Sequence, residues 1–154
     1  MKSLKLFSAL ALLATIITLN SCKTEEKASY STSPTLNTMS MLVGKQWKLT
    51  EEFTLENGQQ VNTLKEYGSC EKDDTYTFMA DGNFLLNDNS TKCSGDQKAA
   101  AGRWAFNNGD AQRIDVASVF RFTADIVEVN PSTLKWKFKN PVGEGFVTQT
   151  FVQQ

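Results

Sequence analysis

The 154-residue sequence contains no histidine, and this absence removes several classes of active and metal site. Ser–His and Cys–His nucleophilic pairs, histidine general bases and histidine-ligated zinc all require an imidazole ring. Paired carboxylates remain as a possible catalytic chemistry, but such clusters beside turns are typically solvated. We therefore expect a protein that is not an enzyme and that holds no metal or cofactor. The acidic residues weighed for a catalytic pair are Glu51, Glu71, Asp73, Asp74 and Glu128.

The chain also lacks an excess of basic residues. Its 16 Lys and Arg residues nearly balance 17 Asp and Glu residues, giving a formal net charge of −1. Domains that bind nucleic acids usually carry a basic patch on one face. We therefore expect no nucleic-acid partner.

Long apolar runs are absent except for one between Leu6 and Leu19, which Lys2 and Lys5 precede. A transmembrane helix needs about 20 apolar residues, so an uncleaved anchor is the weaker interpretation of this shorter run. A basic start followed by a short apolar run is typical of a secretory signal peptide. We predict that residues 1–21 are a lipoprotein signal peptide that is removed.

The four residues Leu19-Asn20-Ser21-Cys22 resemble a bacterial lipobox. The resemblance implies that Cys22 is acylated and becomes the mature N-terminus, which anchors the protein to a membrane without a spanning helix. An ordinary signal peptide cut near Ser21 is the alternative. The location predicted from this pattern is the outer membrane.

Residues 22–39 are rich in Ser, Thr, Lys and Glu, a composition typical of a flexible tether. The run Lys23–Glu26 resembles the signal that directs Bacteroidota lipoproteins to the cell surface, and a solvated linker is the equally weighted alternative. Residues 40–154 have the length of one domain with one core. We expect this domain to be monomeric.

Apolar and polar residues alternate in short runs through residues 40–154. Turn sequences such as Asn57-Gly58, Asp81-Gly82 and Asn140–Gly143 separate these runs. In the clearest case, Leu134, Trp136 and Phe138 face one way and the alternating lysines at 135, 137 and 139 face the other. The pattern predicts an all-β fold with about eight short strands and one helical turn at Met39–Val43. A meander of hairpins removes its exposed edges by closing, so we expect an antiparallel up-and-down β-barrel.

Seven segments of residues 40–154 form an ordered set: Leu42–Leu49, Cys70, Asp73–Phe78, Asp81–Phe84, Cys93, Gly102–Trp104 and Ile126–Leu134. Together they resemble the lipocalin-like domain of small Bacteroidota lipoproteins. The resemblance implies a closed barrel related to lipocalins. Lipocalins carry Gly-x-Trp, whereas two residues separate Gly44 from Trp47 here, so their ligand specificity does not transfer.

The predicted barrel interior is rich in aromatic side chains. Barrels of about eight strands can be filled by side chains alone or can hold one small ligand. We expect an apolar or amphipathic ligand, with a filled barrel that docks another envelope protein as the alternative. The candidate interior residues are Trp47, Glu51, Phe53, Tyr76, Phe78, Phe84, Trp104, Phe122, Trp136 and Phe138.

Glu51 is the polar exception in this set, because strict alternation places it between Leu49 and Phe53 on the inner face. A buried carboxylate without a partner is costly. Three interpretations remain open: Arg103 or Arg121 pairs with Glu51, the interior holds a polar ligand, or a bulge turns Glu51 outward.

The chain has only three cysteines. If Cys22 carries lipid, Cys70 and Cys93 remain to form a disulfide outside the cytoplasm. A hairpin centred on Asp81-Gly82 would place them opposite each other, within the Cα separation that a disulfide needs. We predict a disulfide between Cys70 and Cys93.

Overall fold

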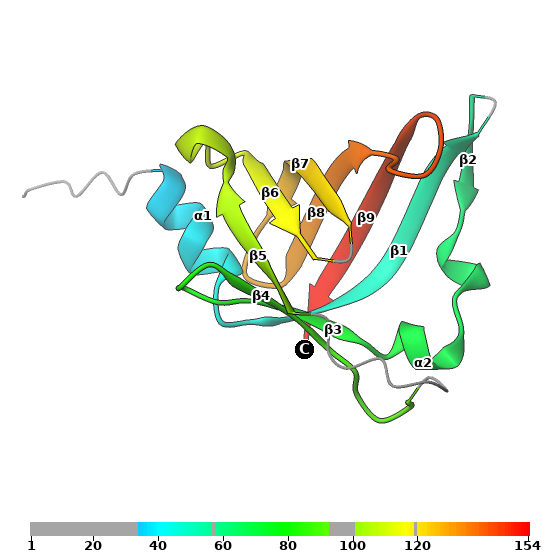
Figure 1. The fold of residues 1–154 in the computed structure, drawn as a ribbon, viewed down its shortest axis with the longest axis horizontal. Coiled ribbons are helices and arrows are strands. Elements are labelled where there is room, and N and C mark those ends of the chain that lie inside the picture. Colours follow the sequence, from blue (N-terminus) through cyan, green and yellow to red (C-terminus); the bar gives the residue numbers. More distant parts are fainter. Residues whose placement is uncertain (1–33, 57, 93–100, 119) are drawn as a thin grey trace, which may run out of the picture. The chain divides into compact units, whose positions relative to one another are not determined.

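The computed structural model of the chain describes residues 34–56, 58–92, 101–118 and 120–154. Nine strands form a single antiparallel sheet in this part of the chain, together with short helices (Figure 1). The elements are α1 (Pro34–Leu42), β1 (Gln46–Glu56), β2 (Gln59–Asn62), η1 (Leu64–Glu66), α2 (Ser69–Lys72), β3 (Thr75–Phe78), β4 (Asn83–Asn87), β5 (Ala101–Phe106), η2 (Asn107–Gly109), β6 (Arg113–Ala117), β7 (Arg121–Val129), β8 (Thr133–Lys139) and β9 (Phe146–Gln153).

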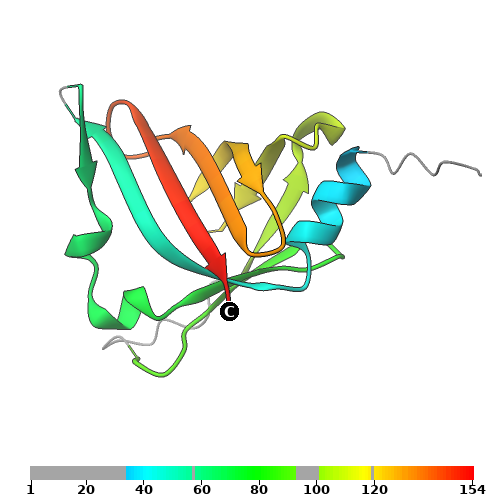
Figure 2. The ribbon, with the colours of Figure 1, turned by 180° about the vertical axis from the view of Figure 1, so that it is seen from behind.

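Eight of these strands form a closed ring. From β3 to β9, each strand pairs with the next along the chain, and β9 then pairs with β1, which also pairs with β3. Figure 2 shows β9 lying between β1 and β8. The ninth strand, β2, lies outside the ring and forms a hairpin with the end of β1. The predicted antiparallel barrel of about eight strands is confirmed.

The hairpin of β3 and β4 turns through three residues, Ala80–Gly82. Met79 donates its backbone N–H to Asn83 O over 2.9 Å, and Gly82 has a φ of +80°. Three-residue hairpin turns place a residue in this left-handed region, which glycine occupies without a Cβ clash. Thr75 pairs with Asn87, so the hairpin is centred on Asp81. The predicted centre between Asp81 and Gly82 is therefore wrong by half a residue step.

A bulge in β1 changes which side chains face the interior. Leu49 pairs with Phe151, but the next pair joins Glu51 to Thr150, so Thr50 is an extra residue. An extra residue reverses the alternation between the two faces of a strand. Leu49 and Glu52 are accordingly buried, whereas Glu51 is exposed.

Helix α1 lies where the chain enters the barrel (Figure 1). Its last residue, Leu42, is fully buried and accepts a 3.0 Å hydrogen bond from Trp47 Nε1. The short helix predicted at Met39–Val43 is present, but it begins at Pro34, so it includes residues 34–39 of the segment predicted as a tether.

No helix within the described part of the chain is long and apolar enough to cross a membrane.

Candidate functional site

A cavity of about 400 Å³ lies inside the barrel. Strands β1, β3, β4, β6, β7, β8 and β9 all contribute to its wall, so the ring of strands surrounds it. Its volume falls in the usual range for sites that bind small molecules. The interior is therefore not completely filled by side chains. The lining residues are Glu52, Thr54, Thr63, Tyr67, Tyr76, Phe84, Leu86, Val116, Ser118, Phe120, Phe122, Trp136, Phe138, Asn140, Pro141, Val142, Val147 and Gln149.

Five of the predicted interior residues form an aromatic wall: Tyr76, Phe84, Phe122, Trp136 and Phe138. Phe122 and Phe138 stack with ring centroids 4.3 Å apart, and Tyr76 stacks on Phe84 at 5.7 Å. Trp136 meets Phe122 edge-on at 5.8 Å. Such ring pairs add to the stability gained from burial, so they hold the wall in place around the empty volume.

Three other predicted residues, Trp47, Phe78 and Trp104, lie in the buried core and not among the cavity-lining residues. Trp104 Nε1 donates to the backbone oxygen of Met79 over 2.9 Å. A buried indole N–H needs such a partner. These residues close the interior at the end nearest α1, because Trp47 donates to the last residue of that helix.

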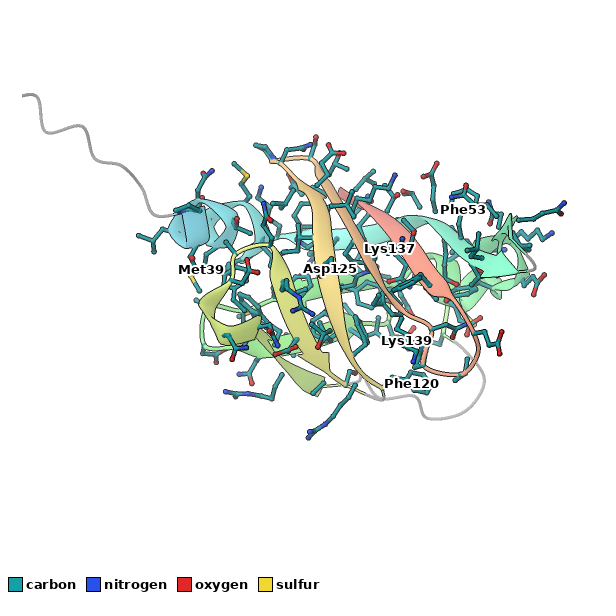
Figure 3. All side chains as sticks on the ribbon, turned by 90° about the horizontal axis from the view of Figure 1, so that it is seen from above. Met39, Phe53, Phe120, Asp125, Lys137 and Lys139 are labelled. Carbon is teal, nitrogen blue, oxygen red and sulfur yellow. The ribbon has the colours of Figure 1, made fainter. Side chains whose placement is uncertain are left out.

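The remaining two predicted interior residues, Glu51 and Phe53, do not face the interior. Phe53 lies in an outer-surface groove with Leu55, Lys137 and Phe146. Figure 3 shows Phe53 away from the centre of the barrel. The bulge at Thr50 is the physical reason, because it shifts the alternation by one residue.

The three interpretations of Glu51 are thereby decided. Glu51 is exposed, as the bulge interpretation requires. Arg103 donates instead to Asn83 Oδ1, over 3.0 Å. Arg121 is exposed and precedes the inward-facing Phe122. Neither arginine is needed to balance a carboxylate that lies in solvent.

Glu52, the residue after Glu51, is the carboxylate that enters the barrel. It is only 7% exposed and accepts hydrogen bonds from Thr63 Oγ1 over 2.7 Å, Tyr67 Oη over 3.0 Å and Gln149 Nε2 over 2.5 Å. Trp136 Nε1 in turn donates to Gln149 Oε1 over 2.7 Å. We call these five residues the Glu52 network. It joins β1, β8 and β9 to the segment that follows β2.

The tyrosines beside the cavity resist ionisation. Burial raises the pKa of Tyr67, and the negative charge of Glu52 and its hydrogen bond raise it further. Burial also raises the pKa of Tyr76 to about 12, with smaller contributions from the charges of Asp74 and Glu52. Both phenols are therefore neutral at physiological pH, and both lie in the negative field of a carboxylate.

We define the mouth of the cavity as Ser118, Phe120 and Asn140–Val142, of which Phe120, Pro141 and Val142 are apolar. Phe120 is 56% exposed and Val142 is 80% exposed, and both line the cavity. These residues belong to the connections from β6 to β7 and from β8 to β9. An apolar molecule approaching the barrel would therefore meet apolar side chains before it reached the aromatic wall.

The acidic residues considered for catalysis do not line this cavity. Glu71 accepts a 2.8 Å hydrogen bond from Gly68 N at the start of α2. Hydrogen bonds from Ser90 and Thr91 hold the pKa of Asp73 below its ordinary value. Burial raises the pKa of Asp74. Within the described ranges, no group of three His, Cys, Asp or Glu side chains is placed to hold a metal ion.

The predicted covalent sites remain predictions. Cys70 lies in α2, whereas Cys93 and Cys22 lie outside the described residues. The β3–β4 ladder ends at Thr75 and Asn87, before it reaches either half of the predicted disulfide.

Sequence reasoning missed the polar part of the site, namely Glu52, Thr63, Tyr67 and Gln149. The adjacent pair of carboxylates at positions 51 and 52 was the available indication, because strict alternation can bury only one of them. Which one is buried depends on the bulge, and the bulge depends on pairing with β9, roughly a hundred residues later.

Comparison with known proteins agrees with this architecture. Residues 42–136 match a family model described as a lipocalin-like domain. The match begins at the end of α1 and stops within β8. No curated protein matches the chain significantly.

Proposed function

The chain belongs to the lipocalin-like domain family, and we propose that it binds a small apolar or amphipathic molecule inside its barrel without catalysing a reaction. The cavity of about 400 Å³ with its aromatic wall is the observation that carries this proposal. Sites for small molecules are typically concave and mostly apolar, with a few polar groups that fix orientation. The Glu52 network supplies such polar groups.

We further propose that the protein acts as a monomer, held at the bacterial outer membrane by a lipid on Cys22. The lipobox-like residues before Cys22 support this location. A barrel tethered in this way would hold its ligand at the envelope, where apolar molecules partition between membrane and water.

Dye binding tests the proposed function. The purified protein is titrated with an apolar dye, such as N-phenyl-1-naphthylamine, whose fluorescence rises in an apolar environment. Leu86→Trp places a large ring in the cavity, because Leu86 lines it. We expect this variant to weaken dye binding about tenfold or more, equivalent to about 1.4 kcal/mol.

Leu85→Trp is the matched control, since Leu85 is the neighbouring residue on the opposite face of β4. We expect it to bind the dye as the unmodified protein does. Absence of dye uptake by the unmodified protein, or equal loss in both variants, would overturn the proposal.

A further inference from the structure

The cavity contains a negative charge that no described cation balances. Glu52 is 7% exposed, and among the described residues that line the cavity it is the one with a formal charge. Two ion pairs lie within the described residues, Lys92 with Asp88 and Arg113 with Asp125, and neither involves a residue that lines the cavity. A buried carboxylate is costly unless it is paired or well hydrogen-bonded.

The direction of the hydrogen bonds shows how this charge is held. An indole N–H can only donate, so Gln149 Oε1 must accept from Trp136. The other end of the amide, Gln149 Nε2, therefore donates to Glu52 Oε2. Thr63 and Tyr67 hydroxyls complete the set. Glu52 is thus arranged as an acceptor, the role of an ionised carboxylate.

This arrangement leaves capacity for a further donor. A carboxylate offers about four acceptor sites, and the side chains of the network fill three of them. Among the described residues, Tyr67 and Gln149 donate to Oε2, and Thr63 is the one donor to Oε1. The three side chains that donate to Glu52 are neutral, so a bound cation would add a charge–charge attraction to these hydrogen bonds.

The surroundings of Glu52 also suit an organic cation. The aromatic rings of Tyr76, Phe122, Trp136 and Phe138 line the same cavity. Aromatic faces attract ammonium groups, more strongly when water is excluded. Burial is the main cause of the raised pKa values of Tyr67 and Tyr76, and the charge of Glu52 adds to both shifts.

We propose that the ligand is an amphipathic cation, with an amine directed toward Glu52 and an apolar body packed between the aromatic wall and the apolar mouth. This inference rests on the proposed function and specifies its ligand class. A neutral molecule of the same shape would lose the interaction with the carboxylate. An anion would be repelled by it.

Three probes with the same alkyl chain test the inference on the unmodified protein. Octylamine, octanol and octanoate share one apolar chain and differ in the charge of the head group. Each is used to displace N-phenyl-1-naphthylamine at neutral pH. We expect octylamine to bind about tenfold or more tightly than octanol, and octanoate to bind most weakly. Octanol binding as tightly as octylamine, or octanoate binding most tightly, would overturn the inference.

Two glutamate variants test whether Glu52 causes the preference for octylamine over octanol. Glu52→Gln keeps the size and one acceptor oxygen of the side chain but removes its charge, and we expect the ratio of octylamine affinity to octanol affinity to fall from about tenfold toward one. Glu51→Gln is the matched control, because Glu51 is exposed on the outer face. It should keep the full preference. An amine preference that persists in Glu52→Gln would contradict the role of Glu52.

The two proposals fail in different ways. If neither the dye nor any probe binds, both the proposed function and the ligand class are wrong. If the dye and octanol bind but octylamine has no advantage, only the ligand class is wrong. Should Glu52→Gln fail to fold, the ranking of the three probes on the unmodified protein still decides the inference.

Discussion

At the scale of single residues, Tyr76 couples the stability of the barrel to pH. Its ring stacks on Phe84 and meets Phe151 edge-on at 5.4 Å, so the phenol is held against the aromatic interior. Burial raises the pKa of Tyr76 to about 12, whereas a tyrosine in an unfolded chain ionises near pH 10. Folding therefore favours the protonated phenol.

The sign of the pH dependence follows from this difference. Below about pH 10 the phenol is protonated in both states, and its contribution to stability is complete. Above pH 10 the unfolded chain loses the proton first, so we expect the free energy of unfolding to fall between pH 10 and 12, by at most about 1.4 kcal/mol per pH unit from this residue.

Urea unfolding at pH 9, 10 and 11 measures this effect, with Tyr76→Phe as the comparison. The phenylalanine variant keeps the ring but has no proton to lose, so its stability should fall less steeply over the same range. Identical slopes for the two proteins would show that Tyr76 ionises as readily in the folded state as in the unfolded chain.

At the scale of elements, α1 is part of the folded domain. Leu42 is fully buried at its C-terminal end, whereas Leu36 is 58% exposed in the same helix. Met39 also packs partly against the core. The helix therefore presents one face to the closed end of the barrel and another to solvent.

This asymmetry gives a prediction with an internal control. We expect Leu42→Ala to lower the free energy of unfolding by about 2 to 5 kcal/mol, because it leaves a void beside Trp47. Leu36→Ala should change stability by less than about 0.5 kcal/mol, since its side chain is largely in solvent. Denaturant unfolding followed by tryptophan fluorescence measures both. Equal effects would mean that α1 does not pack on the barrel as described.

At the scale of the whole molecule, the predicted covalent chemistry uses every cysteine. Cys22 is expected to carry lipid, and Cys70 and Cys93 to form a disulfide that closes a loop of about 20 residues. Closing a loop of this length restricts the unfolded chain and adds roughly 3 kcal/mol to the free energy of unfolding in the chain-entropy model.

The intact mass of the mature, unreduced protein from a bacterial host tests both modifications. We expect a mass that includes the lipid and lacks two thiol hydrogens, with no cysteine available to an alkylating reagent. Cys22→Ser should lose the lipid and its membrane association but keep the disulfide. Two alkylated cysteines in unreduced Cys22→Ser protein would contradict the disulfide.

The sequence by itself determined the local features of this protein. Alternation placed Leu134, Trp136 and Phe138 on the inner face of β8, and each of them is buried. Asp81-Gly82 marked a hairpin because glycine adopts the positive φ found at Gly82 without a Cβ clash. Closure of the sheet followed from the need to satisfy strand edges. These properties depend on neighbouring residues and on a general requirement for paired backbone groups.

Only the tertiary structure decided which carboxylate enters the barrel and what surrounds it. The bulge at Thr50 arises from pairing between β1 and β9, and it exchanges Glu51 for Glu52 on the inner face. Gln149, which donates to Glu52, lies 97 residues away in sequence. The cavity itself is a volume left between side chains of seven strands. Such properties depend on distant segments meeting in one register, which alternation along a single strand does not specify.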